Sequence, residues 1–73
     1  MSTGEEIEVV VNGEVRVLSA GTPVADLVAD LAPGRAAGVA VAVNDEVITR
    51  SAWPAHVLAA GDRVEVVAAT QGG

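Results

Sequence analysis

Cysteine and lysine are both absent from the 73-residue chain, and one tryptophan is its single aromatic side chain. The lack of cysteine excludes disulfides, zinc–thiolate sites and thiol nucleophiles. If the chain carries sulfur, it therefore cannot carry it as a side-chain persulfide.

Basic residues are scarce as well: four arginines stand against ten acidic residues, and the net charge is −6. Binding to nucleic acid or to an anionic membrane needs basic clusters, so we expect neither partner. The acidic start of the chain has no hydrophobic signal region, and no apolar run approaches the ~18 residues of a membrane span. These features indicate a cytoplasmic protein.

The length of 73 residues allows one small domain with a thin core. A ligand cavity of ordinary enzyme size, on the order of 300 Å³, would hollow out that core. We therefore expect a protein that is not an enzyme and that binds no metal and no cofactor of its own.

Alternation of apolar and polar residues predicts β-strands along most of the chain. Residues 7–11 and 14–18 are expected to form a hairpin around Asn12-Gly13, the strongest short hairpin signal, with Val15 and Val17 facing inward. Further strands are expected at residues 39–43, 46–48 and 63–68.

One helix is predicted between these strands. Apolar residues from Val24 to Leu31 recur at the i, i+3, i+4, i+7 spacing of one helix face. Thr22 fits the N-cap, Pro23 fits the first helical position, and Pro33-Gly34 ends the helix. A helix with one apolar stripe covers one face of one sheet, which indicates an α+β fold.

All the periodic apolar faces should meet at one helix–sheet interface. We expect these side chains to be buried there: Ile7, Val9, Val11, Val15, Val17, Val24, Leu27, Val28, Leu31, Val41, Val43, Leu58, Val64 and Val66. The irregular segment 51–60 should be anchored by Trp53, Val57 and Leu58. The polar residues 1–6 are expected to be a disordered extension, residues 7–69 the folded domain, and residues 70–73 a flexible tail.

Side chains that could do chemistry are few. His56 is the one histidine and is expected to be a solvated loop residue, and no serine or threonine has an identifiable base partner. The chemical feature of the chain is therefore its C-terminal tail, Thr70-Gln71-Gly72-Gly73.

A diglycine end is slender and conformationally permissive, so it can thread a narrow channel into the active site of another protein. There the carboxylate could attack the α-phosphate of ATP to give an acyl-adenylate, from which a sulfur nucleophile displaces AMP. The product is a thiocarboxylate. We expect Gly73 to be the reactive residue and Gly72 to permit threading.

Several stretches, in their order and spacing, resemble the ThiS family of ubiquitin-like β-grasp sulfur carriers. They are Val11-Asn12-Gly13-Glu14, Ala40-Val41-Ala42-Val43-Asn44, Arg50 with Trp53, Gly61-Asp62-Arg63-Val64-Glu65-Val66-Val67, and Gln71-Gly72-Gly73. The chain departs from the pattern at Thr49, where relatives often carry proline, and in its six-residue N-terminal extension, residues 1–6.

This resemblance implies a β-grasp fold, with a mixed sheet of strand order 2-1-5-3-4 packed on one helix. It implies a sulfur carrier for thiazole formation in thiamine biosynthesis, adenylated by a ThiF-like partner of the ubiquitin-activating type that uses ATP and magnesium. A cysteine desulfurase would supply the sulfur, and a ThiG-like thiazole synthase would receive it.

Strand parity also predicts a docking patch on the face of the sheet away from the helix. If the first, fifth and third strands are neighbours, small apolar residues gather there and lead into the tail. The residues expected to bind the adenylating partner are Val10, Ala40, Ala42, Val67 and Ala69.

Two alternative functions stay open at this point. The small subunit of molybdopterin synthase shares the diglycine end, but it usually has phenylalanine and a Pro-Pro step where this chain has Val66-Val67-Ala68-Ala69 and no phenylalanine. A non-catalytic protein-binding module could carry the glycine tail incidentally. Adenylation of Gly73 by a cognate partner distinguishes the module from a sulfur carrier.

Overall fold

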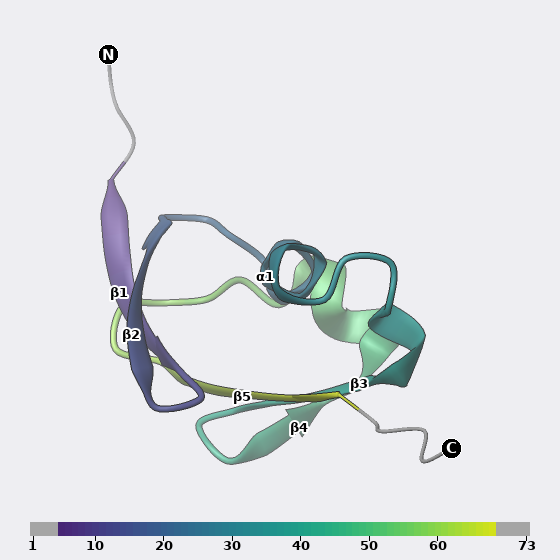
Figure 1. Ribbon diagram of the computed structural model, residues 1–73. Helices are drawn as coiled ribbons and strands as arrows, with labels where there is room; N and C mark the ends of the chain where they lie inside the picture. Colours follow the sequence, from purple (N-terminus) through teal and green to yellow (C-terminus); the bar gives the residue numbers. More distant parts are fainter. Residues whose placement is uncertain (1–4, 69–73) are drawn as a thin grey trace.

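The computed structural model describes residues 5–68, which form a five-stranded sheet with one α-helix against one face (Figure 1). Residues 1–4 and 69–73 lie outside the described part. In chain order the elements are β1 (Glu6–Val11), β2 (Glu14–Ser19), α1 (Val24–Leu31), η1 (Ala36–Gly38), β3 (Val39–Val43), β4 (Glu46–Ile48), η2 (Arg50–Ala55) and β5 (Arg63–Ala68).

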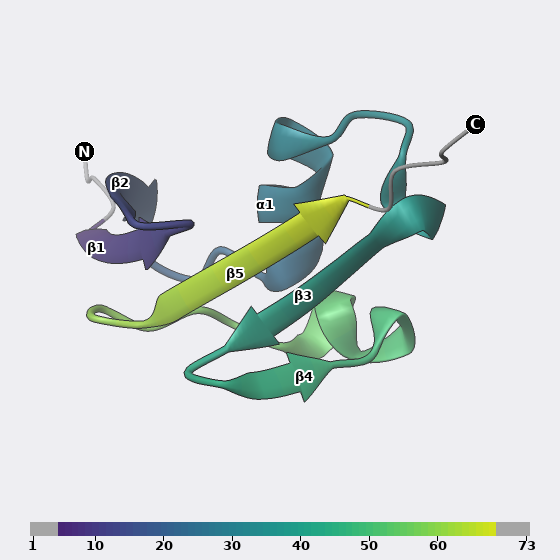
Figure 2. The ribbon, with the colours of Figure 1, turned by 60° about the horizontal axis from the view of Figure 1, so that its bottom comes forward.

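The sheet has the strand order β2-β1-β5-β3-β4, which confirms the expected topology. β1 and β5 are parallel, and the other neighbouring pairs are antiparallel, so the sheet is mixed. In Figure 1 the β1–β2 hairpin stands at a steep angle to β3 and β5, as expected for a strongly twisted sheet. Figure 2 looks onto the open face of the sheet, with β5 and β3 in front of α1.

The core lies between α1 and the sheet. Val24, Leu27 and Val28 form the buried stripe of the helix, as its spacing predicts. The strands add inward-facing residues, of which Val9, Val41 and Val64 are almost fully buried. Burial of each such side chain stabilises the fold by roughly 1.5–3 kcal/mol. Among the other residues expected in the core, Ile7, Leu31 and Val66 are partly buried and pack against it.

Ile48 was not among the residues expected in the core, whereas Trp53 was expected as an anchor of segment 51–60. Ile48 and Trp53 are both buried, and the Trp53 Nε1–H donates a hydrogen bond of 2.9 Å to the carbonyl oxygen of Ile48. Of the other two residues expected to anchor segment 51–60, Leu58 is buried. The prediction for Val57 was wrong, since Val57 is 54% exposed. Consecutive residues of an extended segment point in opposite directions, so Val57 faces outward where Leu58 faces inward.

The prediction that Val15 and Val17 are buried was also wrong, because their side chains are 64% and 55% exposed. The two-residue turn sets Val10 opposite Val15, and paired residues share one face of a sheet. Since Val9 and Val11 face the helix, Val10 and its partner Val15 must face away.

The helix-facing positions of β2 are therefore Arg16 and Leu18. Leu18 packs against the core, and the Arg16 guanidinium lies 3.3 Å from the Asp30 carboxylate of α1. The start of the helix differs from expectation as well. Pro23 is the N-cap residue, and the Thr22 hydroxyl donates to the carbonyl oxygen of Ser19 at 2.6 Å instead of capping.

Among residues 5–68, no helix is long and apolar enough to cross a bilayer.

The two faces of the hairpin can be compared with matched valine substitutions. We expect Val9→Ala to lower the free energy of unfolding by about 1.5–3 kcal/mol, because Val9 is 1% exposed and its loss leaves a cavity. Val17→Ala should cost less than about 1 kcal/mol, since its side chain packs against little. Urea unfolding measures both, and equal losses would contradict the assigned faces.

Candidate functional site

The candidate reactive residues Gly72 and Gly73, together with Ala69, lie outside the described residues. The structure does describe the strand that leads to them. β5 ends at Ala68, and one residue separates it from the first tail residue, Thr70, in the sequence. The site is therefore built from the elements that hold β5 and from the surface around its end.

β5 is the central strand of the sheet and pairs on both sides. Its antiparallel pairing with β3 runs from Val43 opposite Val64 to Val39 opposite Ala68. Its parallel pairing with β1 is shorter and comprises two residue pairs, of which one joins Val11 to Val64. Val64 is fully buried at this crossing, so the first half of β5 is held firmly in the core.

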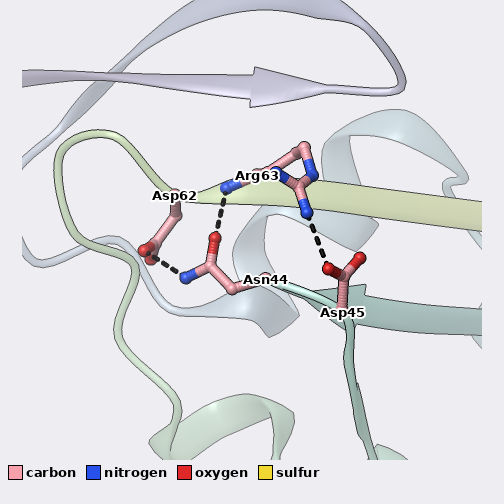
Figure 3. A network of polar contacts seen from close by, with 4 residues as sticks. All are labelled: Asn44, Asp45, Asp62 and Arg63. Atoms are coloured by element: carbon pink, nitrogen blue, oxygen red, sulfur yellow. Dashed lines mark hydrogen bonds and ion pairs between the residues drawn. The ribbon is translucent and has the colours of Figure 1, made fainter.

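The start of β5 is tied to the β3–β4 turn by a network of side chains (Figure 3). The Asn44 side chain donates to the Asp62 carboxylate at 3.0 Å and accepts from the backbone N–H of Arg63 at 2.9 Å. The second carboxylate oxygen of Asp62 accepts from the N–H of Ala59 at 2.8 Å, which closes the turn before β5. An ion pair of 2.8 Å joins Arg63 to Asp45.

The hydrogen bonds in this network matter more than its ion pair. The side chains of Arg63 and Asp45 are 54% and 76% exposed, and such pairs contribute about 0–1 kcal/mol. Asn44 and Asp45 have φ of 52° and 71°, the left-handed conformation that a tight hairpin turn needs and that Asn and Asp tolerate. The network therefore fixes where β5 begins, and we assign it no catalytic role.

The second half of β5 is held by the other hairpin turn. The Asn12 side chain donates to the carbonyl oxygen of Val66 at 3.1 Å and accepts from the N–H of Val66 at 2.9 Å. Its own backbone N–H donates to the carbonyl oxygen of Val64 at 2.9 Å. Each of the two asparagine turns thus binds one part of β5.

The open face of the sheet carries the four predicted docking residues that lie in the described range, and the structure brings three of them together. Ala40 lies opposite Val67, and Ala42 lies opposite Glu65 on one side and Val47 on the other. Val67 and Val47 are 62% and 73% exposed. We call Ala40, Ala42, Val47 and Val67 the tail-end cluster, because Val67 is the residue before the last one of β5.

Val10 does not belong to this cluster. Its neighbours are Val15 on β2 and Arg63 on β5, and Val67 lies four residues further along β5, roughly 13 Å away at the rise of a strand. Val10, Val15 and Val17 form a separate hairpin cluster. Sequence reasoning missed Val15, Val17 and Val47 as surface residues, although the register of a two-residue hairpin would have placed both β2 valines on this face.

A shallow depression of about 310 Å³ adjoins the hairpin cluster. The residues that line it are Glu8, Val9, Val10, Val15, Ala60 and Gly61. It has few polar groups and one carboxylate, which suits an apolar contact better than a reaction.

Acidic side chains flank the apolar residues of the open face. Glu8 and Glu65 are exposed there, whereas the neighbouring Arg63 is paired with Asp45. An apolar surface with unbalanced negative charge matches a partner surface that is apolar and basic.

The other candidate groups for chemistry are not assembled into a site. His56 is half-buried, and its backbone is used in the fold: its carbonyl oxygen accepts from the N–H of Val24 at 2.9 Å. The Thr49 and Ser51 hydroxyls lie 3.5 Å apart with no base beside them. Within the described range, no three His, Asp or Glu side chains are grouped so that they could hold a metal ion.

Comparisons with known proteins agree with this architecture. A family model described as the ThiS family matches residues 4–73. The crystal structure of a thiamine biosynthesis protein (ThiS) from Geobacter metallireducens superposes with a TM-score of 0.76 at 30% identity, covering 92% of this chain and all of the other. A solution structure of a thiamine biosynthesis protein from the same organism gives the same score and identity, covering 92% of this chain and 88% of the other. No curated protein sequence matches the chain.

Proposed function

The chain belongs to the ThiS family, and we propose that it is the sulfur carrier for thiazole formation in thiamine biosynthesis, with Gly73 as the residue that carries the sulfur. The observation that supports this most is the diglycine end, which three residues separate from the central strand, in a chain whose family match extends to residue 73. The chain acts as a co-substrate of partner enzymes and is not itself an enzyme.

The chemistry takes place at the terminal carboxylate. A carboxylate oxygen of Gly73 attacks the α-phosphorus of ATP, pyrophosphate leaves, and an acyl-adenylate forms. Magnesium held by the adenylating partner offsets the negative charge on the phosphates. A sulfur nucleophile then attacks the carbonyl carbon, and AMP departs with the original carboxylate oxygen. With hydrosulfide as the nucleophile, the product is the thiocarboxylate and one proton is released.

A cysteine desulfurase is the proposed sulfur source. Its persulfide forms the C–S bond through the terminal sulfur and leaves an acyl disulfide. A second thiol must then reduce the S–S bond to free the thiocarboxylate, and the two enzyme thiols end as a disulfide. The absence of cysteine from this chain is consistent with such a carrier, since no internal thiol competes for the activated carbonyl.

The partner must bind the folded domain while its active site receives the tail. We propose that the adenylating enzyme, of the ubiquitin-activating type, docks on the tail-end cluster, whose member nearest the end of β5 is Val67. Exposed apolar side chains that lie together often mark an interface, and this cluster adjoins the end of β5. A thiazole synthase is the proposed acceptor of the sulfur.

Docking can be tested by placing a charge in the cluster. We expect Val67→Asp to raise the Kd for the cognate adenylating enzyme about tenfold or more, because it places a desolvated carboxylate in an apolar contact. The fold should be kept, since the side chain is largely exposed. Calorimetric titration measures the affinity.

The matched control for docking is Val57→Asp. Val57 is a similarly exposed valine, but it lies beside Pro23 at the start of α1 and not on the open face. The affinity of the Val57→Asp variant for the adenylating enzyme should equal that of the wild type. Equal affinities for all three proteins would reject the tail-end cluster as the docking surface.

The carrier chemistry predicts a specific mass change. Incubation with the adenylating enzyme, ATP, magnesium and a sulfur source should exchange one oxygen for one sulfur in the C-terminal peptide, as measured by intact-mass and peptide analysis. Gly72→Val should block the exchange, because a β-branched side chain restricts and widens the tail. One residue added after Gly73 should also block it, since the carboxylate is displaced.

Neither tail change touches a described core residue, so neither should lower thermal stability. An unchanged mass, under conditions that convert a known carrier, would make a plain binding module the better account. Formation of the thiocarboxylate without sulfur transfer to a thiazole synthase would instead favour another sulfur pathway, such as molybdopterin synthesis.

A further inference from the structure

We propose that Asn12 is a positioning residue for the C-terminal tail, and that its side-chain amide acts as a short extension of β1 that holds the last part of β5 in place. The inference rests on the proposed function, since the position of the tail matters only if Gly73 must reach a partner's active site.

The need for such an extension follows from where β1 ends. β1 pairs with β5 at Val10 and Val11, and the Asn12 N–H still donates to the carbonyl oxygen of Val64. At Asn12 the chain then turns away into the hairpin. The next backbone groups of β5 that face this side belong to Val66, because alternate residues of a strand direct their N–H and C=O to the same neighbour.

The Asn12 amide occupies the position that the missing strand would have filled. Its oxygen accepts from the Val66 N–H at 2.9 Å, and its nitrogen donates to the Val66 carbonyl oxygen at 3.1 Å. One donor and one acceptor in a plane reproduce what a neighbouring peptide unit offers. Among the described contacts, this pair is what holds Val66 on the β1 side.

On its other side the end of β5 is secured by β3, through Val66 opposite Val41, Val67 opposite Ala40, and Ala68 opposite Val39. A strand paired along one edge can still twist about that edge. Val66 is two residues before the last residue of β5, so a twist there changes the direction in which β5 points at Ala68.

Asn44 supplies a natural comparison. Asn12 and Asn44 both open tight turns, with φ of 51° and 52°, and both bind the backbone of β5 through their side chains. Asn44 binds Arg63, the first residue of β5, and Asn12 binds Val66 near its end. Loss of either amide should weaken the fold, but loss of the Asn12 amide alone should misdirect the tail.

The experiment compares Asn12→Gly with Asn44→Gly. Glycine accepts the left-handed φ of both turns, so each change removes the amide without straining the backbone. Asn12→Asp is the second variant if Asn12→Gly does not fold, because aspartate also tolerates this φ but presents an oxygen to the Val66 carbonyl. The wild-type chain and each variant are assayed with the cognate adenylating enzyme, well below their melting temperatures.

Hydrogen exchange is the first measurement and needs no partner. Amide exchange at Val66, whose N–H donates to the Asn12 side chain, should be faster in Asn12→Gly than in Asn44→Gly when each is compared with the wild type. The adenylation rate is the second measurement. In Asn12→Gly, kcat/KM should fall about tenfold or more, since displacement of a reacting group by 1 Å can cost about a hundredfold. Asn44→Gly should stay within about twofold of the wild type.

Similar kinetic losses in the two variants, or no loss in Asn12→Gly, would overturn the proposal, since Asn12 would then act on stability alone. Failure of the wild-type chain to be adenylated would instead contradict the proposed function. In that case the exchange rate at Val66 decides by itself whether Asn12 holds the end of β5.

Discussion

The parallel pairing of β1 with β5 is the contact on which the rest of the sheet depends. It joins the β1–β2 hairpin to the antiparallel group of β3, β4 and β5, and it comprises two residue pairs. A parallel pair needs a long connection, which here passes through α1 and places that helix over one face of the sheet. The buried stripe of α1, the core beneath it and the open face opposite all follow from this pairing.

Much of this fold could be predicted from local patterns. Hydrophobicity alone, however, could not show which face of β2 points toward the helix. Val15 and Val17 alternate with polar residues as buried residues do, yet they face outward. Apolar alternation identifies a strand but not its inner side, and an amphipathic strand can be apolar on its exposed side. The two-residue turn at Asn12-Gly13 decides the matter, because it makes Val15 the partner of the outward-facing Val10. Strand order was reached through a family resemblance and not through periodicity.

The candidate site was predictable to different extents. The chemistry proposed at Gly73 stays a prediction from the tail sequence, whereas the predicted closeness of Ala40 to Val67, from parity and strand order, is confirmed. The separation of Val10 from Val67 was not predicted, because it depends on the length over which β1 pairs with β5. The contact between Asn12 and Val66 has the same origin. It joins residues 54 positions apart in the sequence, just after the pairing of β1 with β5 ends. No local sequence pattern predicts where that pairing ends.

The asparagine that binds Val66 is followed by Gly13, and this gives the contact a consequence for chemical ageing. An asparagine before glycine is prone to lose ammonia, because the glycine nitrogen can attack the side-chain carbonyl carbon and water then opens the cyclic imide. Two hydrogen bonds to Val66 restrict rotation of the amide while the sheet is intact, which opposes the attack. Once formed, aspartate at this position presents an oxygen to the Val66 carbonyl, so the damage would weaken the pairing that had prevented it. Intact mass, followed during storage, would register this irreversible change.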